Sequence, residues 1–102
     1  MPEMIKVVVQ KPGENSQISE IVNDTETMNS ITGGLSTVIT IPENGLKLVI
    51  NACKCNKDLN LRTLWGEIYG NVIITAMNNG KHISLTAEQC QSARAWLLKH
   101  SI

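Results

Sequence analysis

The chain has 102 residues, 42% hydrophobic and 18% charged, with nine basic side chains balanced by nine acidic ones. A chain of this length builds one core, so we expect a single domain over residues 1–102. The balanced charge excludes both a strongly basic nucleic-acid binder and a highly charged disordered chain. No apolar run approaches the roughly 18 residues of a membrane span, and residues 1–4 do not begin a usual secretory signal. We therefore expect a cytoplasmic protein without a membrane contact.

The first third predicts two strands and a helix. Residues 4–10 read M-I-K-V-V-V-Q, a β-branched run typical of a strand buried on at least one side. Residues 16–22 predict a weaker strand at the edge of the sheet beside it. Asn23 and Glu26 have the spacing of a capping box, and Gly33-Gly34 supplies a left-handed stop. A short helix over residues 24–32 follows.

The middle third predicts a hairpin and then an irregular stretch. Residues 35–41 and 46–50 are apolar and β-branched, and Asn44-Gly45 between them accepts positive φ at little cost. Residues 51–60 are polar and basic and predict no regular element. After them we expect four apolar side chains to return to the core, namely Leu59, Leu61, Leu64 and Trp65.

The last third predicts a second hairpin and a second helix. Residues 72–77 form a β-branched strand, and Asn78-Asn79-Gly80 turns the chain into a strand over residues 82–85. Thr86 and Gln89 form a capping box for a helix that runs to Lys99. Its expected buried stripe is Ala87, Cys90, Ala93, Arg94, Leu97 and Leu98.

These elements predict an α+β fold with a mainly antiparallel sheet of five or six strands and two helices packed on it. We expect both helices on one face of that sheet. The strand order stays open at this stage, including a central, parallel position for the first strand.

Neither a metal site nor a catalytic site is expected. Cys53 and Cys55 are one residue apart, closer than the usual zinc-ligand spacing, and Cys90, His82 and His100 do not form a second ligand pair. The two histidines have no recognisable nucleophile beside them in the sequence. We expect reduced thiols, no cofactor and no enzymatic activity.

Two groups of side chains are candidates for binding a partner. Basic and aromatic residues gather in the second half of the chain, where Lys54, Lys57 and Arg62 precede Trp65 and Tyr69. They suit either phosphate contacts with one stacking surface or aromatic and arginine anchors for a protein. The first half is acidic, and its candidates for engaging a basic groove are Glu14, Glu20, Asp24, Glu26 and Glu43.

Several short motifs carry a family resemblance from Met4 to about Leu98. They are Gly33-Gly34, Asn44-Gly45-Leu46, Asn51, Leu59-Asn60, Ile68-Tyr69-Gly70-Asn71 and Ser84-Leu85-Thr86-Ala87-Glu88. In their order and spacing the chain resembles a small uncharacterised family carried by phages, plasmids and integrative elements of Gram-positive bacteria. The chain departs from that pattern at Asn51 to Cys55, and the resemblance supplies no catalytic residues.

The resemblance implies a mobile-element accessory protein that inhibits a host defence system, as anti-CRISPR and antirestriction proteins do. The leading hypothesis is a non-enzymatic inhibitor that binds a Cas9-type nuclease or its ribonucleoprotein and blocks guide-RNA or DNA engagement. The alternatives are direct RNA or DNA binding through residues 54–65 and a sponge for a signalling nucleotide. A monomer and a homodimer both remain open, since an exposed edge strand either pairs two subunits or is protected by charge.

Overall fold

The computed structural model describes residues 3–53 and 57–101. Eight strands and two helices follow one another in the order β1 (Met4–Gln10), β2 (Gln17–Val22), α1 (Thr25–Thr32), β3 (Ser36–Thr40), β4 (Lys47–Asn51), β5 (Leu59–Thr63), β6 (Gly66–Tyr69), β7 (Val72–Asn78), β8 (Lys81–Ile83) and α2 (Ala87–His100). The predicted α+β class with a mainly antiparallel sheet is confirmed.

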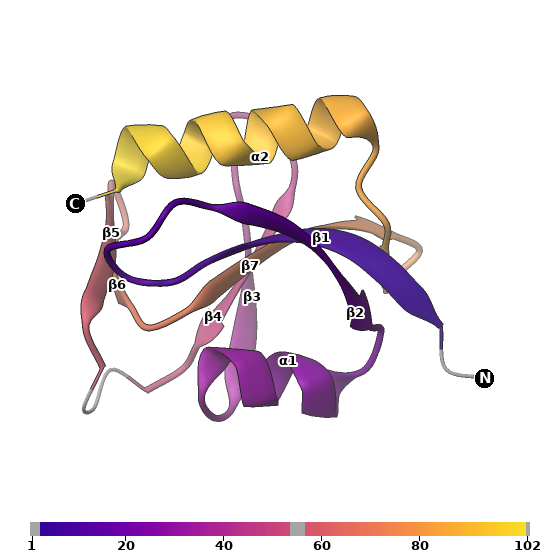
Figure 1. Cartoon of the computed structure of the whole chain (residues 1–102), viewed down its shortest axis with the longest axis horizontal. Helices are drawn as coiled ribbons and strands as arrows, with labels where there is room; N and C mark the ends of the chain where they lie inside the picture. The colour runs from indigo at the N-terminus through magenta and orange to yellow at the C-terminus, as the bar shows by residue number, and fades with distance from the viewer. Residues whose placement is uncertain (1–2, 54–56, 102) are drawn as a thin grey trace.

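The main sheet has six strands in the order β2-β1-β7-β4-β3, and β8 also pairs with β7. The strand β1 lies between β2 and β7. Every pairing in this sheet is antiparallel, so the parallel option for β1 is excluded. The strands β5 and β6 form a separate two-stranded sheet. In Figure 1 this small hairpin stands at the end of the main sheet where α2 finishes.

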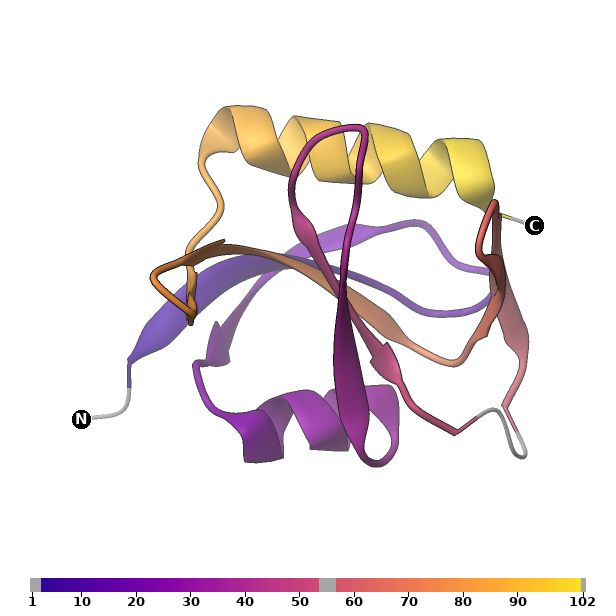
Figure 2. The same cartoon turned by 180° about the vertical axis from the view of Figure 1, so that it is seen from behind.

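The two helices cover opposite faces of the main sheet, as both views show (Figures 1 and 2). The helix α2 closes a large core cluster with Val8, Leu48 and Ile74, whereas α1 places Met28 in a second cluster with Val7, Val49 and Ile73. Our expectation that both helices share one face was therefore wrong. Because β7 contributes Ile73 to one cluster and Ile74 to the other, the strand is buried on both sides.

The first helix begins one residue later than its capping pattern suggests. Asp24 is the N-cap, and its carboxylate accepts a hydrogen bond from Thr27 N at 2.7 Å. Asn23 instead donates its side-chain amide to Glu3 Oε1 and to His82 O. The predicted box between Asn23 and Glu26 is therefore absent, while the predicted stop at Gly33 is confirmed by its φ of 89°.

The two predicted hairpins are present, and their turns differ. Asn79 and Gly80 both have positive φ, as a two-residue hairpin turn requires. In the longer 41–46 connection only Gly45 has positive φ, and Asn44 instead accepts a hydrogen bond from Leu46 N. The capping box of Thr86 and Gln89 is confirmed. The buried stripe of α2 differs from the prediction, because Ala87, Arg94 and Leu98 are exposed and Trp96 is buried.

Candidate functional site

Three of the acidic candidates lie on β2 and at the start of α1, and Asp24 and Glu26 among them have structural roles. Glu20 stands directly opposite Lys6 in the β1–β2 ladder. Asp24 caps α1, and the hydrogen bond from Thr27 holds the pKa of its carboxyl below the usual value. Glu26 occupies the first turn, where a negative charge favours the helix dipole.

Lys57 is half-buried beside the end of α1 and is used by the fold. A Cβ placed on Gly70 would lie 2.9 Å from Lys57 Cδ, and one placed on Gly33 would lie 3.3 Å from Lys57 Nζ. The ammonium therefore sits at the carboxyl end of α1, which carries no basic residue in its own last turn. A cation at that end stabilises the helix dipole.

The motif asparagines and glycines converge on the same helix end. Asn51 donates to Thr32 O at 3.0 Å, and Asn71 donates to Ile31 O at 3.0 Å. These bonds satisfy carbonyls that a helix end leaves without partners. Asn60 is fully buried, and its side-chain amide joins β5 to Gln10 O and Gly70 O. Asn51, Asn60 and Asn71, which belong to the motifs of the resemblance, therefore stabilise the fold.

The cysteines do not form a metal site within the described residues. Cys53 is exposed, and Cys90 lies on the buried side of α2 in the large core cluster, while Cys55 and the candidate Lys54 lie outside the described residues. No group of three or more His, Cys, Asp and Glu side chains there is arranged to hold a metal ion.

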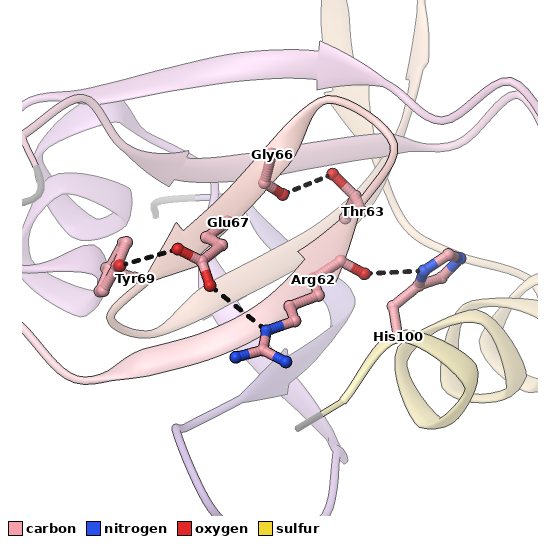
Figure 3. A network of polar contacts seen from close by, with 6 residues as sticks. All are labelled: Arg62, Thr63, Gly66, Glu67, Tyr69 and His100. Atoms are coloured by element: carbon pink, nitrogen blue, oxygen red, sulfur yellow. Dashed lines mark hydrogen bonds and ion pairs between the residues drawn. The ribbon is translucent and has the colours of Figure 1, made fainter.

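The remaining candidates lie on the hairpin of β5 and β6, which the sequence analysis treated as irregular. Arg62 stands opposite Glu67 in the ladder, and its Nε lies 3.3 Å from Glu67 Oε2 (Figure 3). The other carboxylate oxygen of Glu67 accepts a hydrogen bond from Tyr69 Oη at 3.2 Å. This bond and the nearby negative charge raise the pKa of Tyr69. One carboxylate thus holds both the arginine and the tyrosine on the outer side of the hairpin.

The turn of this hairpin presents two apolar side chains to solvent, and we call Leu64 and Trp65 the hairpin tip. Leu64 is 99% exposed and Trp65 is 44% exposed. Thr63 fixes the turn, because its hydroxyl accepts from Trp65 N and donates to Gly66 O. The expectation that Leu64 and Trp65 return to the core was wrong, although Leu61 and Ile68 of the same hairpin are buried.

The core supports the hairpin tip from below. The ring of Trp65 stacks on that of Trp96, with centroids 6.0 Å apart and planes 25° from parallel. Trp96 is only 5% exposed, and its indole Nε1 donates to Glu43 Oε2. Trp65 is therefore an exposed ring on a fixed platform rather than a loose side chain.

His100 closes this platform at the end of α2. Its ring lies 4.5 Å from that of Trp96, and its Nδ1 donates to Arg62 O at 3.0 Å, a contact that Figure 3 shows. A carbonyl only accepts, so the proton resides on Nδ1. Its Nε2 faces Glu43 Oε2 at 3.7 Å. The sequence did not predict that Glu43, Trp96 and His100 come together, because no local pattern joins the 41–46 connection, α2 and β5.

A separate groove of about 550 Å³ runs between the 13–16 loop and α2. Gln10 and Asn60 line it, and their amides bond to each other at 3.0 Å. At its mouth Arg94 Nε donates to Ser16 Oγ. Among the predicted partner-binding residues that the structure describes, Glu14 alone lines this groove.

Comparisons with known proteins give a single result. A family model described as a domain of unknown function (DUF3846) matches residues 5–98. No curated protein and no solved structure matches the chain. Across the described residues, neither helix has the length and apolar character needed to cross a membrane.

Proposed function

The chain belongs to the DUF3846 family, and we propose that it acts without catalysis, by docking its hairpin tip onto a protein partner. The observation that carries the proposal is the exposure of Leu64 and Trp65 above a rigid aromatic support. Exposed aromatic anchors that are already ordered lose little conformational entropy on binding and often dominate interface energies.

The two histidines support a role without catalysis. His82 Nδ1 lies 2.6 Å from Thr75 Oγ1, a hydroxyl and a base in contact. Thr75 is fully buried within β7, however, so no substrate reaches its hydroxyl. His100 is held by Arg62 O and by the Trp96 ring. Both imidazoles are accounted for by packing.

The charges beside the hairpin tip favour a protein over a nucleic acid as the partner. Binding to phosphates needs cations whose charge is uncompensated. Arg62 already pairs with Glu67, and the ammonium of Lys57 lies at the end of α1. The exposed surface of the hairpin is instead apolar at its tip and charge-balanced at its side, which suits an apolar pocket with a polar rim.

We propose a host defence nuclease as the target, with a Cas9-type ribonucleoprotein as the first to test. This choice rests on the family resemblance to mobile-element proteins set out above. The hairpin tip would occupy a pocket that the nuclease needs for guide-RNA or DNA engagement. The acidic residues Glu20, Asp24 and Glu26 would then make no essential contact, because they lie on β2 and at the start of α1 rather than on the hairpin.

The test compares two exposed leucines. Leu64→Ser is expected to abolish co-purification with the nuclease and restore DNA cleavage, because it removes an apolar anchor from the tip. Leu98→Ser changes a leucine of α2 that is 76% exposed and lies outside the tip, and it should retain binding. Equal loss in both variants would contradict the assigned surface. No complex and no change in cleavage at excess protein would exclude this target.

Direct nucleic-acid binding is separated by its salt dependence. If residues 54–65 contact phosphates, an oligonucleotide gel shift at low salt should show a complex that weakens steeply toward physiological salt. Arg62→Gln should then reduce the affinity, whereas Leu64→Ser should not. We expect no shift at low salt, since the Arg62 charge is compensated.

A further inference from the structure

The strand order of the main sheet ends in β2 on one side and β3 on the other, with the short β8 paired to β7 off this path, and the chemistry of β2 and β3 differs. The edge strand β2 carries Glu20 near its middle, and a charge at such a position prevents pairing with a like strand. The edge strand β3 reads S-T-V-I-T and contains no charge and no proline. In Figure 2 β3 is the nearest strand, and no other element passes in front of it. The edge of β3 is therefore the unprotected one.

The hydrogen bonds of the β3–β4 ladder show which backbone groups of β3 point outward. Leu35 O accepts from Ala52 N, and Ile41 N donates to Leu46 O. Along an antiparallel strand, residues bonded to one neighbour alternate with residues whose groups face the other side. Thr37 and Ile39 consequently bond to β4, while Ser36, Val38 and Thr40 direct their N–H and C=O groups to the outer edge.

Only one of these outward groups has a partner among the described residues. Ser36 N donates to Asn29 Oδ1 at 3.0 Å, so the end of α1 covers the start of the edge. The N–H groups of Val38 and Thr40 and the carbonyls of Ser36, Val38 and Thr40 remain available. Val38 is also 42% exposed, so its side chain stands beside the open backbone groups.

We propose that β3 pairs antiparallel with β3 of a second copy, about a two-fold axis through Val38. In this register the N–H of each Val38 donates to the carbonyl of Val38 of the second copy. The N–H of each Thr40 donates to the carbonyl of Ser36 of the second copy. The N–H of Ser36 keeps its bond to Asn29, so the carbonyl of Thr40 of the second copy receives no hydrogen bond from it, and the pairing rests on the bonds at Val38 and on those from Thr40 N–H.

Self-complementarity points to a second copy rather than a foreign strand. The axis places Val38 against Val38 on one face of the sheet, and Thr37 against Ile39 on the other. Because β3 contains no charged residue, the pairing brings no like charges of β3 together. The chain has zero formal net charge, so long-range repulsion between copies is small. The pairing consumes β3, and Glu20 protects β2, so the assembly closes as a dimer instead of growing into a fibre.

The first test is a concentration series by light scattering or sedimentation, from micromolar to millimolar protein. We expect a dimer with twice the 11.2 kDa mass of the chain. Val38→Lys should yield a monomer, because the two introduced ammonium groups meet at the axis. Ile18→Lys is the matched control, since Ile18 lies on the protected edge β2 and is 48% exposed. It should remain dimeric.

Thr40→Pro gives a test without added charge. The proline removes one outward N–H per copy and leaves the β3–β4 ladder intact, because the N–H of Thr40 does not face β4. The dissociation constant of the dimer should rise about tenfold or more, since each copy loses one intermolecular hydrogen bond. Circular dichroism and thermal unfolding of each variant establish that it is folded.

Hydrogen exchange assigns the surface residue by residue. The amides of Val38 and Thr40 should become slower to exchange as concentration rises, whereas those of Thr37 and Ile39 should be protected at every concentration. A monomer throughout the series overturns the proposal. So does a dimer that survives Val38→Lys, or equal dissociation by Val38→Lys and Ile18→Lys. The β3 edge does not include the hairpin tip, so Leu64→Ser should leave the protein dimeric.

Discussion

The hairpin tip and the acidic start of α1 use their side chains in opposite ways. At the start of α1 the charges hold the fold together: Asp24 caps the helix and Asn23 ties it to Glu3 and β8. At the hairpin tip Leu64 and Trp65 face solvent, although apolar side chains of this size are usually buried.

This contrast shows why exposure and polarity must be weighed together. A polar residue on a surface is often engaged with its neighbours, as Lys57 and Arg62 are. The 99% exposure of Leu64 on an ordered hairpin is not explained by burial in the core. Trp96 is buried and contributes to the core, whereas Leu64 is almost fully exposed and contributes little to it. The exposure of Leu64 therefore favours a role in binding over a role in folding.

The largest expected effect separates the platform from the tip. Trp96→Ala removes a ring that is 5% exposed within the main core cluster, and it should lower the free energy of unfolding by about 3–5 kcal/mol. Trp65→Ala should cost about 1 kcal/mol, because it loses mainly the stacking contact. Urea unfolding of both variants measures the difference. Comparable losses would mean that Trp65 belongs to the core rather than to a docking surface.

The sequence predicted the main elements well where the signals are local. The strands β1 and β7, the α2 capping box and the Gly33 stop depend on a few adjacent residues, and each is present. The helix faces could also have been predicted. The run Val72 to Ala76 is apolar but for Thr75, and such a run indicates burial on both sides of a strand. Both faces of the sheet therefore needed a cover.

The hairpin of β5 and β6 was missed for two physical reasons. Its turn contains Leu64 and Trp65 in place of the usual glycine and asparagine pair. The pairing also shifts at Asn60, which has no partner in the ladder and turns its amide inward to Gln10 O and Gly70 O. A bulge of this kind interrupts the alternation by which a strand is recognised.

The candidate site was predicted in part. Arg62, Trp65 and Tyr69 do lie on one hairpin, and Glu67 joins the first and the last of them. The support from Glu43, Trp96 and His100 could not have been predicted, because it joins elements that are distant along the chain. Asp24 and Glu26 were placed correctly at a helix start, with the N-cap shifted by one residue.

A smaller effect is expected at the start of α1, where two acidic residues can be compared. Asp24→Ala removes the cap and should lower Tm by a few degrees, whereas Glu26→Ala removes only a dipole contact and should lower it less. The pKa of Asp24 is depressed when folded, so its stabilisation is present above the unfolded value of 3.8 and is lost as pH falls through the folded pKa.

The comparison of the two variants is therefore made by thermal unfolding at about pH 7 and about pH 2. The difference between Asp24→Ala and wild type should shrink as pH falls through the folded pKa of Asp24, because the carboxyl then becomes protonated in the folded state as well. A loss from Asp24→Ala that persists unchanged at low pH would show that its charge contributes nothing. If Glu26→Ala lowered Tm more than Asp24→Ala, Asp24 would not be the main stabilising residue at the start of α1.

The smallest effect concerns His82, whose backbone carbonyl accepts from Asn23 next to the same helix start. Burial lowers the pKa of this imidazole from 6.5, so the folded protein favours its neutral form. Its stabilisation is complete above that unfolded value and is lost as pH falls toward the folded pKa. We expect Tm to fall modestly between about pH 7 and about pH 5 in the wild type and less in His82→Asn. If the wild type and His82→Asn showed identical pH profiles of Tm, His82 would not contribute to the pH dependence of stability. The start of α1 would then respond to mild acid no more than the apolar hairpin tip does.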